Sequence, residues 1–312
     1  MREGFKMNQK GIRLIDTAVP FDYAQMMDHL YEADRAYPFL ELSYLGASIL
    51  DRAIPLIKIG SGRRKLLYVG AHHGMEWITS ALLTKFIKEL CLTIQRDGYV
   101  GHLHCKSIFN THTIYIIPML NPDGVEYQIH GVKKENPLFE RLIEMNGGKE
   151  DFSTWQANAR GVDLNHNYDA GFSEYKKEET CHGGAPSLYS GDAPESEDEV
   201  RLLCNFIRYH EDLLGVMTLH TQGKEIFWGR AGSRPQKSEQ IVTRLSRLTG
   251  YRPSTATGSA AYGGLCDWCT ERLGIPAFTV ECGKGKNPLP FSSLSHLYTE
   301  LREALFTFPI LL

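Results

Sequence analysis

Several features that mark particular protein classes are absent from this chain. No apolar run approaches the ~20 residues that a membrane-spanning helix needs. Lys and Arg number 34 against 37 Asp and Glu, so the formal net charge is −3, and no basic stripe is available for nucleic acid. Internal repeats and low-complexity linkers are missing as well. We therefore expect no membrane and no nucleic-acid partner.

The seven cysteines are an odd number and lack the spacing of a disulfide framework. In a chain of this length, such cysteines indicate reduced thiols in the cytoplasm. The polar residues 1–13 lack the apolar stretch of a secretory signal and predict the same compartment. Cys266 and Cys269 form one CxxC pair, but no second pair completes a zinc ribbon, so we interpret them as structural.

Helical and strand-like patterns alternate along the chain, which has 312 residues, 42% of them hydrophobic. The predicted helices cover residues 21–35, 77–95, 195–209 and 293–306, and the predicted strands cover residues 54–59, 65–69, 113–117, 215–219 and 277–280. This alternation predicts an α/β fold with a largely parallel or mixed sheet. We expect residues 1–53 to form an N-terminal helical lead-in segment and residues 54–312 to form the main domain.

Polar residues follow four of the predicted strands. They are His73 and Glu76, then Asn121 and Asp123, then His220, and finally Glu281. Ligand sites in open α/β sheets lie at the carboxyl ends of strands. These distant parts of the chain are therefore predicted to meet in one cleft.

His73 and Glu76 stand three residues apart at a predicted strand-to-helix turn. From there both side chains can reach one zinc ion, at about 2.0–2.2 Å. His220 is the best candidate for a third ligand, which would leave a fourth position for water, as in catalytic zinc sites. His72 is the rival ligand, but only His73 is in HxxE register with Glu76, so we interpret His72 as a packing residue. An HxxE pair alone occurs often by chance, and the HExxH and HxxEH motifs are absent.

Six segments together resemble the metallocarboxypeptidase, or zinc carboxypeptidase, family. In chain order they are residues 70–77 (GAHHGMEW), 121–124 (NPDG), 161–167 (GVDLNHN), 219–221 (LHT), 263–268 (GGLCDW) and 278–281 (FTVE). The resemblance runs from about residue 60 to the C-terminus. It implies a single domain with a mixed sheet of about eight strands sandwiched between helices.

The same resemblance implies the roles of four residues. His73, Glu76 and His220 match the zinc ligands, and Glu281 matches the general base that deprotonates a zinc-bound water and hands the proton to the leaving amine. Zinc lowers the pKa of its water toward about 7, so a nearby carboxylate can remove the proton. Residues 54–312 would then be a zinc peptidase catalytic domain.

Two departures from the family pattern concern the substrate. Family members that remove C-terminal residues have, after this asparagine, an arginine that pairs with the terminal carboxylate of the substrate. In this chain His166 follows Asn165 at that position, and histidine is shorter than arginine and only partly charged. The family often has an arginine or lysine that stabilises the oxyanion of the tetrahedral intermediate. At that position this chain has Gln156, which can donate an N–H hydrogen bond but carries no charge. Arg160 could substitute for it, or both could be loop residues.

Two further positions bear on specificity. Cys266 lies where the family has the floor of its specificity pocket, and this small, neutral residue argues against selection of basic side chains. Tyr262 is a few residues from the place of the family's mobile, substrate-capping tyrosine. It is equally well interpreted as an ordinary packed tyrosine.

Residues 155–165 and 168–172 (YDAGF) most resemble bacterial γ-D-glutamyl-L-diamino acid endopeptidases. These enzymes cut the bond between D-glutamate and a diamino acid in peptidoglycan stem peptides, which implies a peptide or muropeptide substrate. Two alternatives are a carboxypeptidase for ordinary peptides, against which His166 counts, and a catalytically impaired zinc-dependent peptide-binding protein. Gln156 and His166 give some support to the last, but the ligands and Glu281 are retained.

Overall fold

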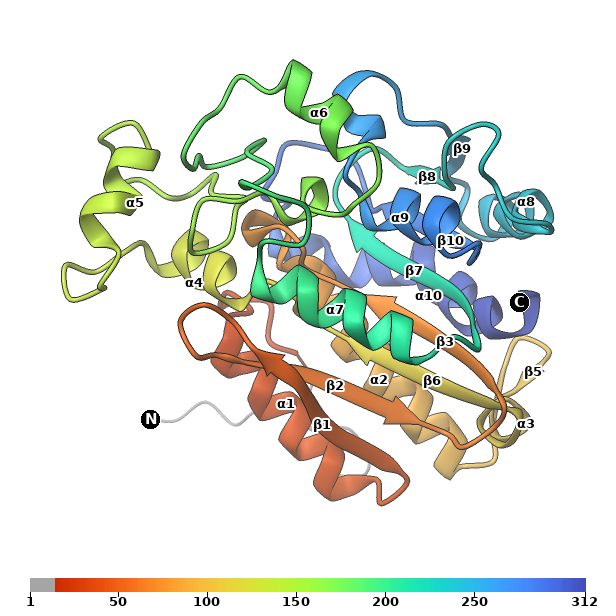
Figure 1. Cartoon of the computed structure of the whole chain (residues 1–312). Helices are drawn as coiled ribbons and strands as arrows, with labels where there is room; N and C mark the ends of the chain where they lie inside the picture. Colours follow the sequence, from red (N-terminus) through yellow and green to blue (C-terminus); the bar gives the residue numbers. More distant parts are fainter. Residues whose placement is uncertain (1–14) are drawn as a thin grey trace, which may run out of the picture.

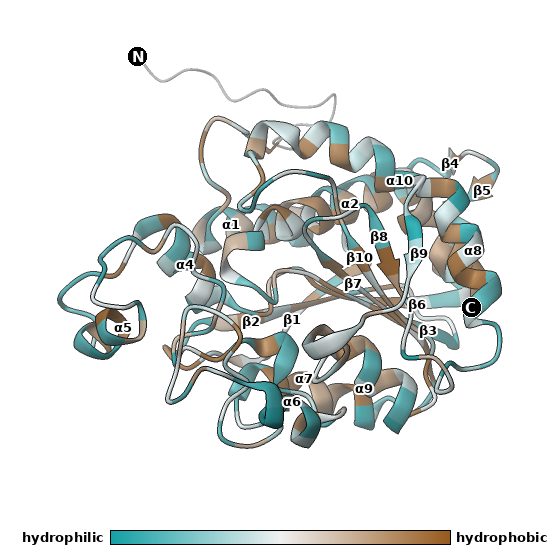
Figure 2. Ribbon diagram, turned by 90° about the horizontal axis from the view of Figure 1, so that it is seen from above, coloured by the Kyte–Doolittle hydropathy of each residue, from teal (hydrophilic) through white to brown (hydrophobic). Residues whose placement is uncertain are grey.

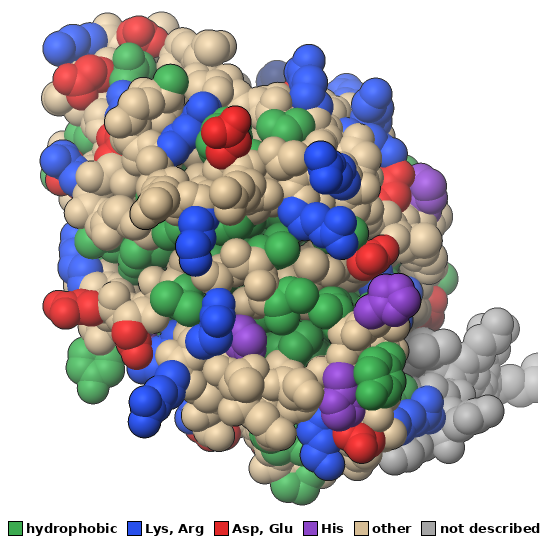
Figure 3. Space-filling view, turned by 90° about the vertical axis from the view of Figure 1, so that its right-hand side faces the viewer, with side chains coloured by type: hydrophobic (Ala, Val, Ile, Leu, Met, Phe, Trp, Pro, Cys, Tyr) green, Lys and Arg blue, Asp and Glu red, His purple; other side chains and the backbone are tan. Residues whose placement is uncertain are grey.

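The computed structural model describes residues 15–312. The polar residues 1–13, considered above for a secretory signal, lie outside this part of the chain. Within it, no helix is both long enough and apolar enough to cross a lipid bilayer. On the face drawn in Figure 3, Lys and Arg side chains lie scattered, with Asp, Glu and His side chains among them, rather than in one stripe.

An eight-stranded mixed sheet forms the centre of the molecule (Figure 1). In spatial order its strands are β1 (Leu40–Ala47), β2 (Ala53–Ile59), β6 (His112–Ile117), β3 (Arg64–Val69), β7 (Leu213–His220), β10 (Ala277–Glu281), β8 (Glu225–Phe227) and β9 (Arg252–Ser254). The central strands β6, β3, β7 and β10 are parallel to one another. The β1–β2, β2–β6 and β10–β8 pairs are antiparallel, and β8–β9 is parallel.

Helices cover both faces of the sheet, and Figure 2 shows the apolar strands between two helical layers. Side chains of β3 alternate between the faces, with Leu66 and Tyr68 on one side and Leu67 and Val69 on the other. The first face packs on α1 (Tyr23–Ala36), α2 (Ile78–Gln95), α3 (Cys105–Thr111), α8 (Ser238–Thr249) and α10 (Leu294–Leu311), and the second on α7 (Asp198–Tyr209) and α9 (Leu265–Arg272). The predicted α/β fold, a single domain with a mixed sheet between helices, is confirmed.

The remaining elements are too short to show a periodic apolar pattern. They are α4 (Pro122–His130), α5 (Phe139–Met145), α6 (Phe172–Glu178), the hairpin β4 (Tyr99–Val100) and β5 (Leu103–His104), and the 3₁₀ turns η1 (Gly74–Glu76), η2 (Leu164–His166), η3 (Gly258–Ala261) and η4 (Phe291–Ser293). Of these, η1 and η2 carry residues of the predicted site.

The segment before residue 54 shares the core of the molecule. Helix α1 buries Met26 and Leu30 in the cluster that contains Phe86 of α2. Residues 40–47, for which the sequence predicted no strand, form the edge strand β1, paired with β2. Only Leu40 of this strand is fully buried, so the apolar alternation that reveals a strand is missing. The division of the chain at residue 54 into lead-in segment and catalytic domain stays a prediction.

The five predicted strands are present as β2, β3, β6, β7 and β10. Because β6, β3, β7 and β10 are adjacent and parallel, their carboxyl ends lie along one edge of the sheet. His220 and Glu281 end β7 and β10 and are direct neighbours in the register of that pair. The fold therefore brings His73, Glu76, His220 and Glu281 to one place. Asn121 and Asp123, predicted for the same cleft, do not line it: Asn121 caps α4, and Asp123 pairs with Arg52 at 2.6 Å.

Candidate metal centre and its surroundings

Three side chains point their donor atoms at one another beyond the ends of β3 and β7. His73 precedes η1, Glu76 ends it, and His220 is the last residue of β7. The Nδ1 atoms of His73 and His220 are 3.3 Å apart. The Glu76 carboxylate completes the triangle, with Oε1 at 3.1 Å from Nδ1 of His73 and Oε2 at 3.1 Å from Nδ1 of His220. All three side chains are buried.

This triangle has the size of one face of a zinc coordination sphere. Tetrahedral bonds of about 2.0–2.2 Å place neighbouring ligand atoms roughly 3.3–3.6 Å apart. The two imidazole nitrogens are 3.3 Å apart, within this range, and each lies 3.1 Å from its own oxygen of the Glu76 carboxylate. Two imidazole nitrogens and a carboxylate are also the donors that zinc accepts in catalytic sites. His73, Glu76 and His220 therefore fit a zinc ion.

Neighbouring groups fix the orientation of these ligands. Asp163 Oδ1 lies 3.2 Å from Nε2 of His73, so the carboxylate holds the ring with Nδ1 toward the triangle. The Glu76 carboxylate accepts hydrogen bonds from Thr221 N at 3.2 Å and Asn287 Nδ2 at 3.3 Å. Sequence reasoning assigned no role to Asp163 or Asn287. The first lies within the 161–167 segment that carries the family resemblance, whereas the second lies in none of the six segments.

Asp163 ties several parts of the site together. Its carboxylate is fully buried and also accepts hydrogen bonds from Gln156 Nε2 at 2.8 Å, Leu188 N at 3.1 Å and Asn165 N at 3.2 Å. Burial opposes ionisation of Asp163, but the charge of His73 outweighs it and lowers the pKa of the carboxyl. The side chain is therefore an ionised acceptor of four bonds.

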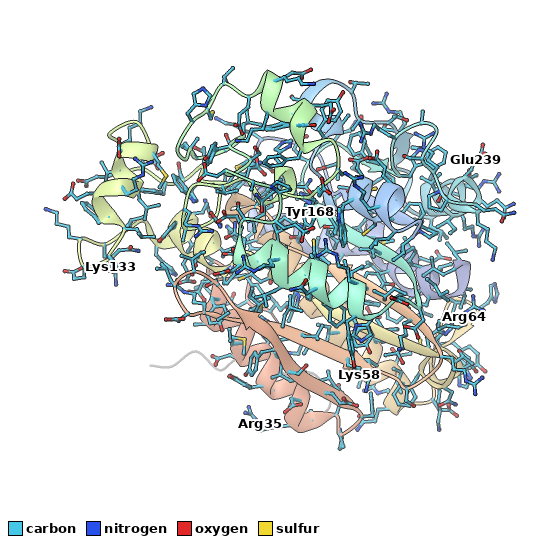
Figure 4. The ribbon with its side chains drawn as sticks, viewed as in Figure 1. Arg35, Lys58, Arg64, Lys133, Tyr168 and Glu239 are labelled. Carbon is cyan, nitrogen blue, oxygen red and sulfur yellow. The ribbon has the colours of Figure 1, made fainter. Side chains whose placement is uncertain are left out.

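His72 packs behind the triangle and takes no part in it. Its Nε2 lies 3.0 Å from the hydroxyl of Tyr168, a residue near the centre of the view in Figure 4, and its Nδ1 lies 3.2 Å from Thr218 Oγ1. The ring stacks on that of His220 at a centroid distance of 5.1 Å. Burial lowers the pKa of His72 well below its ordinary value, so the ring stays neutral. This placement agrees with its interpretation as a packing residue.

The charges around the triangle favour a cation. Burial acts to raise the pKa of Glu76, but His73 and His220 outweigh it and lower that pKa to about 2. Burial also opposes the charged form of His73, yet Glu76 and Asp163 raise its pKa well above the ordinary value. Glu281 has its pKa raised well above normal by burial and by the negative charge of Glu76. The ionised carboxylates of Glu76 and Asp163 beside two imidazoles thus create a site that stabilises positive charge.

Glu281 lines a cavity of about 190 Å³ together with His73, Asn165 and His166. Asn165 Oδ1 accepts a hydrogen bond from Leu265 N at 3.2 Å, which anchors it to the start of α9. The ring of His166 stacks on Tyr175 at 4.1 Å, and its Nδ1 lies 2.9 Å from the Tyr262 carbonyl oxygen. The structure thus brings Glu281, Asn165 and His166 together beside the metal ligands.

Gln156 and Arg160, the two candidates for oxyanion stabilisation, lie in different surroundings. Gln156 bonds to Asp163, and its carbonyl accepts a hydrogen bond from Gly74 N, next to His73, at 2.8 Å. Arg160 is turned away, because its Nε and Nη2 donate to the Glu197 carboxylate at 3.0 Å each. It lines a separate cavity of about 530 Å³ that none of the metal-binding candidates lines.

Tyr262 is half-buried, and its ring lies under the guanidinium of Arg230, 5.0 Å from the ring centroid. Only its carbonyl oxygen contacts the predicted substrate residues, through His166. Its side chain does not line the 190 Å³ cavity. The structure therefore places Tyr262 beside the site rather than across it.

Comparisons with known proteins agree on one family. The zinc carboxypeptidase family matches residues 25–304. The γ-D-glutamyl-L-diamino acid endopeptidase 1 of Lysinibacillus sphaericus is 34% identical over 288 residues, covering 92% of this chain and 72% of that protein. Carboxypeptidase B of Bos taurus is 25% identical over 261 residues, covering 77% of this chain and 57% of that protein. The structure of thrombin-activatable fibrinolysis inhibitor matches with a TM-score of 0.72 at 19% identity, over 95% of this chain and 76% of that one, which shows the fold alone.

Proposed function

The chain belongs to the zinc carboxypeptidase family, and from that premise we propose that it hydrolyses the γ-D-glutamyl bond to a diamino acid in peptidoglycan stem peptides. Members of this family are metallopeptidases, and thus hydrolases. The substrate assignment is supported above all by the 34% identity, over 92% of the chain, to a γ-D-glutamyl-L-diamino acid endopeptidase. The partner would be a peptide or a muropeptide.

The surroundings of His166 support cleavage within a peptide rather than removal of a C-terminal residue. An arginine can pair with a terminal carboxylate through two parallel N–H bonds, whereas an imidazole cannot. One ring nitrogen of His166 already faces the Tyr262 carbonyl at 2.9 Å, and the ring is stacked on Tyr175. Only the other nitrogen remains to contact the substrate.

His73, Glu76 and His220 would hold the zinc ion. When bound, zinc polarises the scissile carbonyl and lowers the pKa of a water molecule to about 7. The Glu281 carboxylate then takes up the proton of the attacking water and passes it to the amine nitrogen that leaves as the C–N bond breaks. The position of Glu281 supports this role, because it is the strand neighbour of His220 and lines the same cavity as His73.

Gln156 is the group that we assign to oxyanion stabilisation. Its Nε2 donates one hydrogen to Asp163 at 2.8 Å, which leaves the second hydrogen of the amide for the substrate. Asp163 fixes the direction of this second N–H and orients His73 at the same time. A neutral donor is weaker than an arginine, but a positioned N–H in a water-poor site still stabilises developing negative charge.

The proposal is tested by offering two substrates to the purified protein, with zinc and with a chelator. One is a γ-D-glutamyl-diaminopimelate tripeptide, and the other is a hippuryl peptide with a free C-terminus. We expect cleavage of the first, lost with the chelator and restored by zinc. Cleavage of only the hippuryl peptide would show an ordinary carboxypeptidase, and cleavage of neither by zinc-loaded protein would show a peptide-binding protein.

Glu281→Gln separates metal binding from turnover. Gln keeps the size of the side chain but cannot take up a proton, so we expect full zinc content and a loss of kcat by several orders of magnitude. Zinc content is measured by mass spectrometry of the folded protein. An active Glu281→Gln variant would contradict the assignment of the base.

We place the reaction in the cytoplasm. All seven cysteines are free thiols, and six of them are buried. A reducing compartment keeps such thiols in this state without a disulfide framework. Fractionation of cells that produce the protein, followed by detection with an antibody, tests this placement; recovery in the medium or in the cell-wall fraction would contradict it.

A further inference from the structure

The segment that follows Glu281 is anchored by groups that lie outside the cavity. Glu281 ends β10, and the chain runs on through Cys282 to Gly283, a buried glycine. The turn between β7 and β8 makes two contacts with this segment. Gly223 N donates to the Gly283 carbonyl oxygen, and Lys224 N donates to the Glu281 carbonyl oxygen, at 2.9 Å each. The backbone that carries the Glu281 side chain is therefore tied to the neighbouring turn.

A tyrosine hydroxyl makes a third contact with the same segment. Tyr251, which precedes β9, is 1% exposed, and its hydroxyl oxygen accepts a hydrogen bond from Gly283 N at 3.1 Å. The hydroxyl also lies 2.8 Å from Oε2 of Glu300 in α10. Because the Gly283 N–H can only donate, the hydroxyl must point its own proton at Glu300. The result is a directed chain from amide through hydroxyl to carboxylate, in which each bond strengthens the next.

Charge fixes the acceptor end of this chain. Burial opposes ionisation of Glu300, but its hydrogen bonds with Lys224 and Tyr251 outweigh burial and lower the pKa of the carboxyl. The ammonium of Lys224 bonds to Oε1, and His296 Nε2 lies 3.1 Å from the same oxygen, so Oε2 is left for Tyr251. Burial raises the pKa of Tyr251, so the hydroxyl keeps its proton. Glu300 is thus an ionised acceptor, and Tyr251 is a neutral donor.

Lys224 joins this chain to the turn between β7 and β8. Its φ of 54° lies in the left-handed region, which residues other than glycine adopt rarely. Its N–H bonds to the Glu281 carbonyl oxygen, its own carbonyl oxygen accepts from Arg252 N at 2.9 Å, and its ammonium bonds to Glu300. The surrounding contacts therefore hold Lys224 in an unfavourable conformation, as is common beside functional groups.

We infer that Tyr251 and Glu300 are positioning residues for Glu281, although neither lines the cavity. They fix Gly283, two residues beyond Glu281, and so keep the carboxylate of the base within reach of the water that it deprotonates. Reaction rates depend steeply on such placement, since a displacement of about 1 Å can cost about 100-fold. The inference rests on the proposed function through the role of Glu281 as base, not through the identity of the peptide.

Tyr251→Phe removes the hydroxyl and leaves the rest of the side chain in place. Because the buried Gly283 N–H is then unpaired, we expect kcat to fall by about 10-fold, at unchanged zinc content and with KM within about twofold of the wild type. Tyr298→Phe is the matched control: its hydroxyl also bonds to a glutamate, Glu89, at 2.7 Å, and the variant should keep the wild-type kcat. A kcat within about twofold of the wild type in folded Tyr251→Phe would overturn the inference.

Changes at Glu300 separate positioning from a general loss of stability. Glu300→Ala should lower kcat as Tyr251→Phe does, and the double variant should be no slower than either single one, because both changes break one chain. Glu300→Gln keeps an oxygen for the Tyr251 hydroxyl and should recover most of the lost rate. Effects that multiply in the double variant, or a Glu300→Gln variant as slow as Glu300→Ala, would contradict the role of the chain.

Amide hydrogen exchange tests the same contacts without a substrate. Peptides that cover residues 281–288 should exchange faster in zinc-loaded Tyr251→Phe and Glu300→Ala than in the wild type, and at the wild-type rate in Tyr298→Phe. Equal exchange of this segment in all four proteins would overturn the inference. Turnover is measured with whichever of the two peptides above is cleaved. If only the hippuryl peptide or neither is cleaved, the proposed function fails, and the exchange rates still decide whether Tyr251 and Glu300 hold this segment.

Discussion

Replacing Asp163 by Asn changes few atoms but removes half of the acceptors that organise the site. Oδ1 accepts from His73 and Asn165 at 3.2 Å each, and Oδ2 accepts from Gln156 at 2.8 Å and Leu188 at 3.1 Å. An Asn side chain offers one oxygen, so in either orientation its amide NH₂ faces two N–H donors. Each unpaired buried donor costs about 1–3 kcal/mol, which predicts a loss of roughly 2–6 kcal/mol in the free energy of unfolding.

The same substitution should weaken zinc binding. Without a carboxylate at Nε2, the His73 ring loses both its fixed orientation and part of its basicity, and such changes typically reduce metal affinity by about 10- to 100-fold. Affinity is measured by competition with a chromogenic chelator, and stability by urea denaturation of the chelator-treated protein. Asp34→Asn, an exposed change of the same kind, is the control.

Two results would contradict the role of Asp163. A zinc affinity within about threefold of the wild type would show that Asp163 does not position His73 for the metal. An unchanged urea midpoint would show that its four hydrogen bonds do not stabilise the fold. The two readouts are independent, because the stability measurement uses metal-free protein.

Two further predictions concern the fold around the site. Burial raises the pKa of Glu199 to about 8. Between about pH 4.5 and 8 the folded state therefore binds a proton at Glu199 that the unfolded state has lost. As the pH rises through this range, the free energy of unfolding falls by up to ~1.4 kcal/mol per pH unit. Thermal midpoints at pH 5 and pH 8 should therefore differ less in Glu199→Gln than in the wild type; an equal difference contradicts the prediction. A Cβ at Gly74 would lie 2.4 Å from the carbonyl oxygen of Gly124 and 2.9 Å from that of Trp155, both backbone atoms. Gly74→Ala should lower the free energy of unfolding by about 1–3 kcal/mol or more, and a wild-type urea midpoint would count against the close approach.

The sequence predicted several parts of the fold that carry periodic signals, but α8 was missed although Ile241, Val242 and Leu245 recur on its buried face. The five strands and four helices predicted from apolar patterns are present; β3 and β7 lead to the metal-binding candidates, and β10 ends at Glu281. Strand β1 was missed because it is an edge strand with one fully buried residue. Strands β8 and β9 have three residues each, which is too few to show alternation.

The site was predictable where its residues lie next to a strand end and was not where it depends on long-range contacts. His73 and Glu76 share a turn, so their spacing was informative. Asn287 reaches Glu76 from 211 positions along the chain, and no local pattern announces such a contact. Arg160 lies four positions from Gln156, but the buried carboxylate of Glu197 draws its guanidinium to another cavity.

The central claim is that one zinc ion binds where His73, Glu76 and His220 meet. X-ray data collected on either side of the zinc absorption edge from crystals of the zinc-loaded protein test it directly. We predict one strong anomalous peak within about 2.0–2.2 Å of Nδ1 of both imidazoles and of the carboxylate. A second group of potential ligands, Asp22, Glu126 and His130, lies near the start of α1 and is more exposed. A peak there, with none between His73 and His220, would contradict the claim.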